Sequence, residues 1–391
     1  MKISKLELEN FRNYDNLTLQ FDSDVSVLYG ENGQGKTNIL EAVYLCSCLR
    51  SHRTSKDTDL IFHDKDEYRI SLEYFDDDTA GITPLFMENI SIVYQEANIK
   101  DPGRLKNRRI LKHNDMALSK ASDVLGLFNA VIFAPEDLYM IKEGPSTRRR
   151  FVDILISQIR PMYFNELNIF QRILSQRNSL LKQMRDRQID RDYGQLAVWD
   201  ISLAGTCAKI ISTRIDFTKK ICEIASRCHR EISSGKEEIY VKYKTISGID
   251  MNNSVEEIKD IIFEKLKTNF YEDIEKGNTT YGPHRDDLEI TINGEIIRSF
   301  ASQGQQRTAV LALKIAELEI IRSETGSYPV LLLDDVMSEL DEKRRKTLLK
   351  SIGDAQVILT CTDKAHVAHE FLEENPGRTI KYYEVDAGRI L

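Results

Sequence analysis

The sequence predicts an α/β protein in which a sheet is built from both ends of the chain and a helical hairpin is inserted between them. Three observations support this prediction. Apolar residues alternate along the first 30 residues and lead into a glycine-rich loop, the apolar residues 330–333 end in two aspartates, and residues 146–233 show long helical periodicity. We therefore expect residues 1–145 and 234–391 to form one head and residues 146–233 to form an arm.

The first half of the expected head consists of short strands. Apolar positions alternate in residues 3–8, 17–21 and 25–29, which predicts three strands separated by turns. A helix should follow the glycine-rich loop, because Ile39, Val43 and Cys46 recur at helical spacing. Further strands are expected at residues 68–75, 90–95 and 130–134.

The arm is expected to be a helical hairpin. One helix should begin near Ser146 and break at Pro161, and a second should continue from there to about Arg187. At 1.5 Å per residue the second helix would be about 40 Å long, which is enough for a protruding arm. The polar stretch 189–194 predicts a turn, after which the chain returns as a helix. Strands should resume at residues 238–243 and 288–292, and the chain should close with helix, strand, helix, strand.

Composition indicates an ordinary globular protein without a membrane span. Hydrophobic residues make up 41% and charged residues 30% of the 391, and no run approaches the roughly 18 apolar residues that a spanning helix requires. The polar–apolar alternation of residues 1–7 does not match a signal peptide. The six cysteines form no CxxC pair. We expect a cytoplasmic protein with reduced cysteines, no disulfide and no structural metal.

Charge is segregated along the chain. The formal net charge of −8 by itself argues against a nucleic-acid partner. Residues 100–120, however, carry seven Lys or Arg against two Asp, and residues 146–191 carry ten against four acids. Salt screens charges beyond about 8 Å, so local excesses decide contacts with phosphates. The candidates for such DNA contacts are Lys106, Arg108, Arg109, Arg148, Arg149 and Arg150. A solvated face or intramolecular ion pairs would explain the same residues.

Residues 30–37 form a phosphate-binding loop, or P-loop. The motif G-x-x-x-x-G-K-[ST] is matched at every position, between an expected strand and an expected helix, by Gly30, Glu31, Asn32, Gly33, Gln34, Gly35, Lys36 and Thr37. The glycines allow backbone N–H groups to surround phosphates, and the helix N-terminus adds its positive dipole. Lys36 should reach the β- and γ-phosphates of ATP, and the Thr37 hydroxyl should bind Mg²⁺. We assign these residues and Asn38 to ATP binding.

A second motif lies near the other end of the chain. Residues 330–333 predict a strand buried on both faces, with two carboxylates at its C-terminal end, where open α/β sheets place their ligands. Asp334 is the expected Walker B aspartate that holds Mg²⁺, and Asp335 is placed to orient the attacking water. Lys36, Asp334 and Asp335 are therefore the predicted catalytic residues. A solvated turn after a core strand is the alternative for the two aspartates.

A third motif precedes the Walker B strand. Ser302-Gln303-Gly304-Gln305 resembles the signature motif of ABC ATPases, Leu-Ser-Gly-Gly-Gln. A hydroxyl and a glycine N–H at a helix N-terminus form an anion site, so Ser302, Gly304 and Gln305 are assigned to ATP binding. Taken alone, the same residues would also suit a helix cap. Residues 338–341 resemble the D-loop that follows Walker B in these ATPases.

Together these motifs resemble the RecF family, which is related to the SMC-type ATPases. The matching stretches span essentially the whole chain and are residues 8–14, 30–37, 51–54, 133–138, 148–151, 282–285, 302–307 and 334–335. The resemblance implies an ABC/SMC-type P-loop ATPase head with a short helical arm. It also implies an ATP-dependent homodimer in which each nucleotide lies between one subunit's P-loop and the other's signature motif, and it places Arg12 at the ATP site.

The resemblance further implies a role in DNA repair, recombination and replication. Members of the family bind duplex DNA and act with RecR and RecO to help load RecA at single-strand gaps. For this chain we expect slow hydrolysis of ATP. Two departures from the wider ABC pattern bear on hydrolysis. Asp335 stands where Glu is usual, and Thr362 stands near the position of the missing switch histidine. Residues 133–136 are the candidate Q-loop, with Glu136 in place of Gln.

Two other classes of P-loop protein are alternatives. A metabolic kinase would not need the signature and D-loop residues. The ATPase subunit of an ABC membrane transporter would have them, but here the P-loop and the signature are about 265 residues apart, with a basic arm between them.

Overall fold

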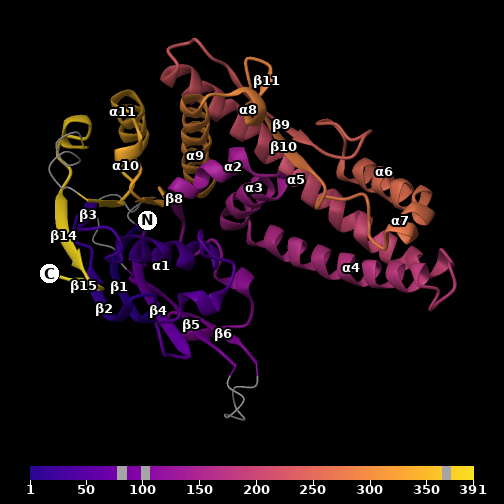
Figure 1. Cartoon of the computed structure of the whole chain (residues 1–391), viewed down its shortest axis with the longest axis horizontal. Helices are drawn as coiled ribbons and strands as arrows, with labels where there is room; N and C mark the ends of the chain where they lie inside the picture. The colour runs from indigo at the N-terminus through magenta and orange to yellow at the C-terminus, as the bar shows by residue number, and fades with distance from the viewer. Residues whose placement is uncertain (77–85, 98–105, 363–370) are drawn as a thin grey trace.

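The computed structural model describes residues 1–76, 86–97, 106–362 and 371–391. Residues 100–105 of the basic segment lie outside these ranges. Figure 1 shows a head built around two sheets, with a lobe of long helices extending from it. Among the described residues, no helix is both long enough and apolar enough to cross a membrane.

The sheet that carries the sequence motifs joins both ends of the chain. Its strand order is β15-β14-β3-β13-β12-β8, and all neighbours except β14 and β15 run parallel. The strands are β3 (Val25–Tyr29), β8 (Ala130–Phe133), β12 (Val330–Leu333), β13 (Val357–Cys361), β14 (Ile380–Asp386) and β15 (Arg389–Ile390). Every residue of β8, β12 and β13 is buried, as expected for strands covered on both faces. The predicted α/β fold class is confirmed.

The second sheet contains most of the other predicted strands. It is antiparallel, in the order β2-β1-β4-β5-β6-β7. The strands are β1 (Lys2–Phe11), β2 (Tyr14–Gln20), β4 (Glu67–Phe75), β5 (Glu88–Gln95), β6 (Arg108–His113) and β7 (Met116–Leu118). Burial alternates along β4 and β5, so one face packs on the core and the other faces water. The sequence did not predict β6 and β7, because charged residues dominate β6 and only Leu111 in it is buried.

Helix α1 (Lys36–Cys48) follows the P-loop and packs between the two sheets. Its apolar residues share one hydrophobic core with both sheets. Ile39, Val43 and Cys46, the residues that predicted this helix, have no exposed surface. The helix ends where Leu49 adopts a left-handed backbone conformation, with φ at 56°. This packing holds the P-loop at the carboxyl edge of the parallel sheet.

Three helices cover the segment that the sequence assigned to an arm, namely α3 (Pro145–Ile159), α4 (Pro161–Arg185) and α5 (Gly194–Ile232). Pro145 and Pro161 each begin a helix, at a position where the missing N–H has no helical acceptor. Helices α4 and α5 pack along each other as a hairpin (Figure 1). The end of α4 lies two residues before the predicted Arg187, which adopts a left-handed conformation with φ at 56°.

The chain after the hairpin packs back onto α5. The elements in this segment are β9 (Ile239–Lys244), α6 (Val255–Thr268), α7 (Phe270–Lys276), β10 (Asp287–Ile292) and β11 (Glu295–Ile296). The motif at residues 282–285 lies inside this packing. Arg214 donates to the Pro283 carbonyl at 2.7 Å, and the His284 ring packs beside Phe170. Residues 239–292 thus pack against α3, α4 and α5.

Helix α9 (Gln303–Thr325) connects the arm to the head, because it packs against α5 on one side and β8 on the other. The shorter helices lie around it and at the edges of the sheets. They are η1 (Asp57–Leu60), η2 (Ala121–Asp123), η3 (Pro135–Leu138), α2 (Tyr139–Lys142), α8 (Ile297–Phe300), α10 (Val336–Glu339) and α11 (Glu342–Ser351).

A buried ion network fixes the outer part of the arm. Arg177 of α4 has no exposed surface. It donates to Asp200 of α5 at 2.6 Å, to Asp273 of α7 at 2.7 Å and to Thr279 at 2.9 Å. Burial opposes the guanidinium charge, but Asp200 and Asp273 together raise the pKa of Arg177 above its usual value. One side chain therefore ties together three segments of the lobe.

We predict that Arg177→Ala lowers the free energy of unfolding by about 3–5 kcal/mol, because it leaves two buried carboxylates without their counter-charge. Arg172→Ala is the matched control, since Arg172 is exposed on the same helix. It should change stability by no more than about 0.5 kcal/mol. Chemical denaturation of both variants tests this, and equal stability of the two would contradict the assignment.

Candidate nucleotide-binding site

The P-loop lies between β3 and α1 with the backbone shape that its glycines predict. Gly30, Gly33 and Gly35 have positive φ values of 148°, 83° and 116°. The Lys36 side chain turns back over the loop and donates to the carbonyls of Gly30 at 2.6 Å and Glu31 at 2.9 Å. Only 4% of Lys36 is exposed. The ammonium group is therefore held at the concave side of the loop.

The loop is fixed from two sides through Gln34. Its carbonyl accepts hydrogen bonds from the Asn13 amide at 2.9 Å and from the backbone N–H of Gly388 at 3.1 Å. Its side-chain oxygen accepts from the backbone N–H of Ala387 at 2.6 Å. The turn between β14 and β15 thus clamps the P-loop through the two oxygens of Gln34. Sequence reasoning missed this contact, because residues 387–388 match no motif.

The Walker B aspartate meets the P-loop threonine. Asp334 Oδ1 accepts hydrogen bonds from Thr37 Oγ1 at 2.8 Å and from Thr360 Oγ1 at 2.9 Å. Burial raises the pKa of Asp334 above its usual value, and the two hydroxyls partly offset this effect. Thr360 also accepts from the backbone N–H of Asp335 at 2.8 Å. Sequence reasoning missed Thr360, although its position at the end of β13 next to the Walker B strand is a usable signal.

The donor set fits Mg²⁺. Thr37 and Asp334 supply a hydroxyl and a carboxylate oxygen side by side, and Mg²⁺ prefers such hard oxygen ligands. Among the described residues no three His, Cys, Asp or Glu side chains group into a metal site. Mg²⁺ in nucleotide sites is usually held by one or two carboxylates together with the phosphates of the nucleotide. Glu136 of the candidate Q-loop lies near enough for its charge to act on Asp334, and its Oε2 is buried without a partner.

Arg12 and Asn38 are tied to residues around the loop. The Arg12 guanidinium binds both oxygens of buried Glu41 at 2.8 Å, and it also donates to the Asp59 carbonyl at 2.7 Å. The Asn38 side chain donates to Asn13 at 2.8 Å and accepts from Arg53 at 2.9 Å. These contacts brace the P-loop, and direct contact of Arg12 or Asn38 with ATP stays a prediction. Sequence reasoning did not assign Glu41 a role.

The signature residues form the start of α9. Ser302 Oγ accepts from the Gln305 backbone N–H at 3.2 Å, and the Gln305 side chain accepts from the Ser302 N–H at 2.8 Å. This reciprocal pair is a capping box, so the helix-cap alternative describes the local structure. Ser302, Gly304 and Gln305 nevertheless line a surface cavity of about 270 Å³. The signature assignment and the cap are therefore compatible.

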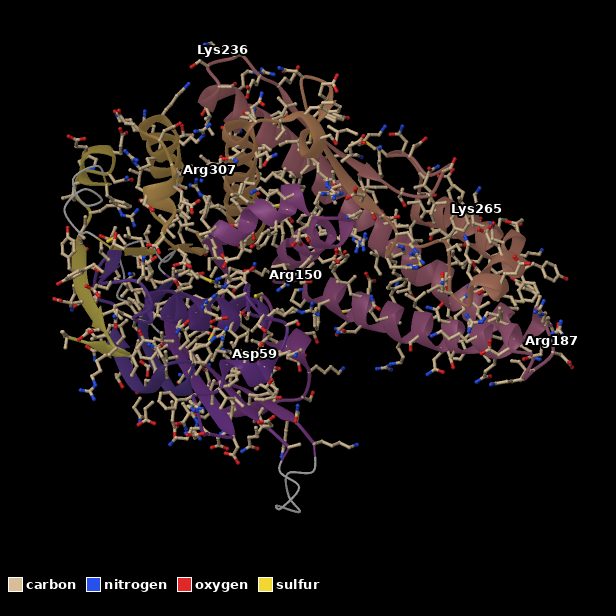
Figure 2. The ribbon with its side chains drawn as sticks, in the orientation of Figure 1. Asp59, Arg150, Arg187, Lys236, Lys265 and Arg307 are labelled. Atoms are coloured by element: carbon tan, nitrogen blue, oxygen red, sulfur yellow. The ribbon has the colours of Figure 1, made fainter. Side chains whose placement is uncertain are left out.

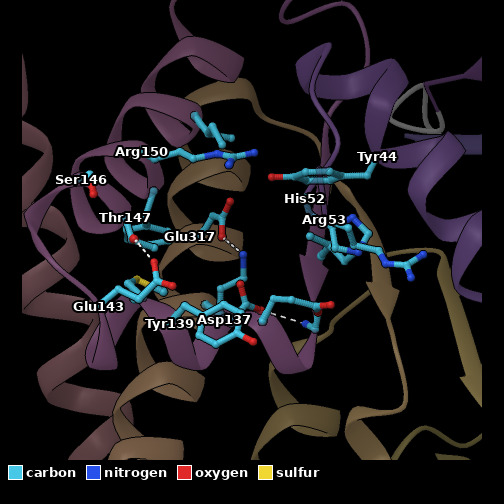
Figure 3. Close-up of a pocket in the computed structure, with 17 residues that line it drawn as sticks. Tyr44, His52, Arg53, Asp137, Tyr139, Glu143, Ser146, Thr147, Arg150 and Glu317 are labelled. Carbon is cyan, nitrogen blue, oxygen red and sulfur yellow. Dashed lines mark hydrogen bonds and ion pairs between the residues drawn. The ribbon is translucent and has the colours of Figure 1, made fainter. Parts of the chain in front are cut away.

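A larger cavity of about 470 Å³ separates α1 from α3 (Figure 3). Tyr44, His52 and Arg53 line one side of it, and Arg150 lines the other. The buried ion pair of Lys314 and Glu317 lies at its base. Burial lowers the pKa of His52 to about 4, so this ring is neutral at physiological pH.

The basic candidates divide into two groups. Arg148 is only 8% exposed and binds both oxygens of Asp287, at 2.7 and 2.9 Å. Arg109 forms an ion pair with Asp57 and donates to the Leu49 carbonyl at 2.8 Å. These two arginines make internal contacts of the kind that the intramolecular alternative expects, and their contact with DNA stays a prediction.

The other basic candidates remain accessible. Lys106 and Arg108 are exposed at the start of β6. Arg149 and Arg150 each donate to a backbone carbonyl, that of Asp286 for Arg149 and that of Ser51 for Arg150, both at 2.7 Å. Both also line a cavity of about 250 Å³ where the arm joins the head. Figure 2 shows Arg150 at this junction.

Comparison with known proteins identifies the family. Residues 2–380 match the family model described as RecF/RecN/SMC N terminal domain. The DNA replication and repair protein RecF of Acetivibrio thermocellus is 42% identical over 389 residues, which cover 100% of this chain and 99% of that protein. The chain belongs to the RecF family. The RecF protein of Clostridium beijerinckii is 41% identical over 391 residues, covering 100% of this chain and 98% of the relative.

Solved structures agree with membership in the RecF family. The structure described as the recombination mediator protein RecF-ATP in the RecFOR pathway has a TM-score of 0.87 and 34% identity. The match covers 100% of this chain and 96% of that one. An Smc head bound to the C-winged helix domain of ScpA has a TM-score of 0.52 at 16% identity, and covers 100% of this chain and 98% of that one. It shares the fold alone. The predicted ABC/SMC-type head is confirmed.

We predict that Gly30→Ala destabilises the protein much more than Gly33→Ala. A Cβ at Gly30 would lie 2.3 Å from the Val385 carbonyl oxygen, so the P-loop and β14 would have to separate. A Cβ at Gly33 would meet nothing within 4 Å, which leaves only the strain of its positive φ, about 1–2 kcal/mol. Because the clash adds to this strain, we expect Gly30→Ala to lower the free energy of unfolding by about 3 kcal/mol or more. Equal free energies of unfolding would refute the close contact between Gly30 and the Val385 carbonyl.

Proposed function

We propose that this member of the RecF family is an ATP-driven switch that acts on DNA in recombinational repair and replication. In this proposal ATP and Mg²⁺ bind at the P-loop, two copies of the chain close on two nucleotides, and the dimer holds duplex DNA next to a single-strand gap. The family resemblance adds RecR and RecO as partners in loading RecA. The relatives support this over the subunit of a membrane transporter, since they match along the whole chain and are named for DNA replication and repair.

The proposed binding of ATP and Mg²⁺ is based on the geometry of the P-loop. Lys36 would release at least one of the carbonyls of Gly30 and Glu31 to reach the β- and γ-phosphate oxygens, since an ammonium has only three donors. Thr37 and Asp334 would hold Mg²⁺, which when bound neutralises charge that develops on the transferred phosphoryl group. Both residues are already in hydrogen-bond contact, so the site needs little rearrangement.

Asp335 is the proposed residue that orients the attacking water. Its backbone adopts a left-handed conformation, with φ at 51°, and Thr360 fixes its N–H. That geometry turns the chain sharply after β12. A carboxylate one methylene shorter than the usual Glu reaches less far, which is consistent with slow hydrolysis.

The observation that supports a composite site best is Gly304. A Cβ there would meet only Arg344 Nη2 at 3.4 Å and Ser302 Oγ at 3.9 Å, both ordinary contacts. The residue lies in a helix, and no positive φ requires a glycine. Glycine in a helix costs up to about 1 kcal/mol relative to alanine. The fold therefore gains nothing from Gly304, whereas a partner subunit's nucleotide needs close approach to this N-terminus.

The proposed DNA surface is where the arm leaves the head. Arg149 and Arg150 face it from α3, and Arg50 faces it from the head. The adjoining part of α4 carries exposed Asn168 and Gln171, and residues 167–185 contain no acid. Arginine and amide side chains are typical contacts for phosphate oxygens, so we propose recognition of the backbone and of duplex shape without sequence preference.

We predict that Gly304→Ala leaves folding and monomer binding of ATP intact but weakens ATP-driven dimerisation by tenfold or more. Sedimentation at several protein concentrations, with and without ATP, measures the dimer constant. Lys36→Ala is the contrasting variant, which should lose ATP binding itself. If Gly304→Ala dimerises like the unmodified protein, the methyl is tolerated and the composite site is wrong.

We predict that replacing Arg149 and Arg150 with Ala weakens duplex binding about equally for unrelated sequences. The dependence of log K on log salt should flatten by about 0.9 for each phosphate that the protein no longer neutralises. The double variant Lys346→Ala, Lys381→Ala removes the same charge from residues paired with Glu342 and Asp22, and is the control. An unchanged slope would exclude the junction and leave Lys106 and Arg108, at the start of β6, as the residues that bind DNA.

A further inference from the structure

Arg344 joins the signature helix to the D-loop. It lies in the first turn of α11, and its guanidinium contacts two other segments at once. Nη2 donates to the Gly304 carbonyl at 2.8 Å, Nε donates to Thr308 Oγ1 at 2.8 Å, and Nη1 donates to the Asp341 carboxylate. Thr308 in turn donates to the Gly304 carbonyl at 2.9 Å. A single planar side chain thus closes a ring of hydrogen bonds around the first turn of α9.

Asp341 is the other end of this connection. It caps α11, because its side chain accepts from the Arg344 backbone N–H at 2.9 Å. It is also the last residue of the D-loop, residues 338–341. The D-loop begins with Ser338, which donates to the Asp335 carbonyl at 2.7 Å. These hydrogen bonds, together with the backbone of the D-loop, therefore connect Asp335, the residue proposed to act at the chain's own P-loop, with Gly304, which in the proposed dimer serves the P-loop of the second copy.

We propose that Arg344 is a positioning residue for ATP-driven closure, which holds the signature helix and the D-loop in one fixed arrangement so that both reach a second copy of this chain together. The inference rests on the proposed composite site. Arg344 itself does not touch ATP. It acts through Gly304 and Asp341, and its fork of donors is what allows it to bind both.

The position of the cluster agrees with this role. Ser302, Gly304, Asp341 and Arg344 all line the surface cavity of about 270 Å³. Helix α9 begins beside α8 and β11, at the end away from α1 (Figure 1). The Arg344 side chain is 19% exposed, so its contacts are partly sheltered from water and the ring can hold its shape. A flexible D-loop would have to be ordered again at each closure, at a cost in dimer affinity.

The test compares Arg344→Gln and Arg344→Lys with Lys346→Gln. Lys346 lies on the same helix, is 46% exposed and pairs with Glu342, so its variant removes equal charge without touching the signature. Three quantities are measured for each: the melting temperature, the ATP affinity at concentrations where the protein is monomeric, and the dimer constant with ATP. The ATPase rate against protein concentration separates a loss of assembly from a loss of turnover in the assembled dimer.

We expect Arg344→Gln to keep its ATP affinity within about twofold and its dimer to weaken at least tenfold, with Arg344→Lys intermediate, because an ammonium keeps the charge but not the planar fork. Lys346→Gln should match the unmodified protein. Combining Arg344→Gln with Ser302→Ala should weaken the dimer by less than the product of the two single effects, since both act on one element.

Different failures have different meanings. If the unmodified protein does not dimerise with ATP, the proposed composite site fails and this inference fails with it. If it dimerises and Arg344→Gln does so equally well, the composite site stands and the role of Arg344 is wrong. If Arg344→Gln also lowers the melting temperature or the ATP affinity of the monomer markedly, Arg344 only maintains the fold. If the effects of Arg344→Gln and Ser302→Ala on the dimer constant simply multiply, the two residues act independently and the proposed role of Arg344 is also wrong.

Discussion

The nucleotide site depends on the register of parallel strands that come from opposite ends of the chain. β13 pairs with β3 so that Cys361 lies opposite Tyr29, and it pairs with β12 so that Leu359 lies opposite Leu333. This alignment brings the carboxyl ends of three strands to one edge, where Asp334, Thr360 and the P-loop meet. A slip of one residue would move a strand by about 3.3 Å, more than the 2.8 Å hydrogen bond between Thr37 and Asp334 allows.

Much of this arrangement could be predicted from the sequence, because the parts that carry chemistry are also the most constrained locally. The P-loop needs glycines at fixed spacing and a lysine at its end. A fully buried strand needs an unbroken apolar run, and two prolines mark the starts of α3 and α4. Such signals lie within a few residues of one another, so they can be recognised without knowledge of the fold.

What could not be predicted depends on partners far away in the sequence. Arg148 has the same neighbours in sequence as Arg149 and Arg150, yet it alone meets Asp287, 139 residues later. No local pattern distinguishes an arginine that binds an internal carboxylate from one that faces water. The clamp of Ala387 and Gly388 on the P-loop is of the same kind. A motif gives the chemistry of a side chain, whereas the fold decides which side chains remain free to use it.

The same register has a consequence for how the protein is made. Strand β3 is synthesised early, but both of its neighbours, β13 and β14, lie beyond residue 356. At roughly 5–20 residues per second, the ribosome needs on the order of 20–70 s to supply them. Throughout that interval the apolar edge of β3 and the flank of α1 have no native cover. Premature termination before residue 357 would therefore release a chain in which β3 lacks both of its neighbouring strands.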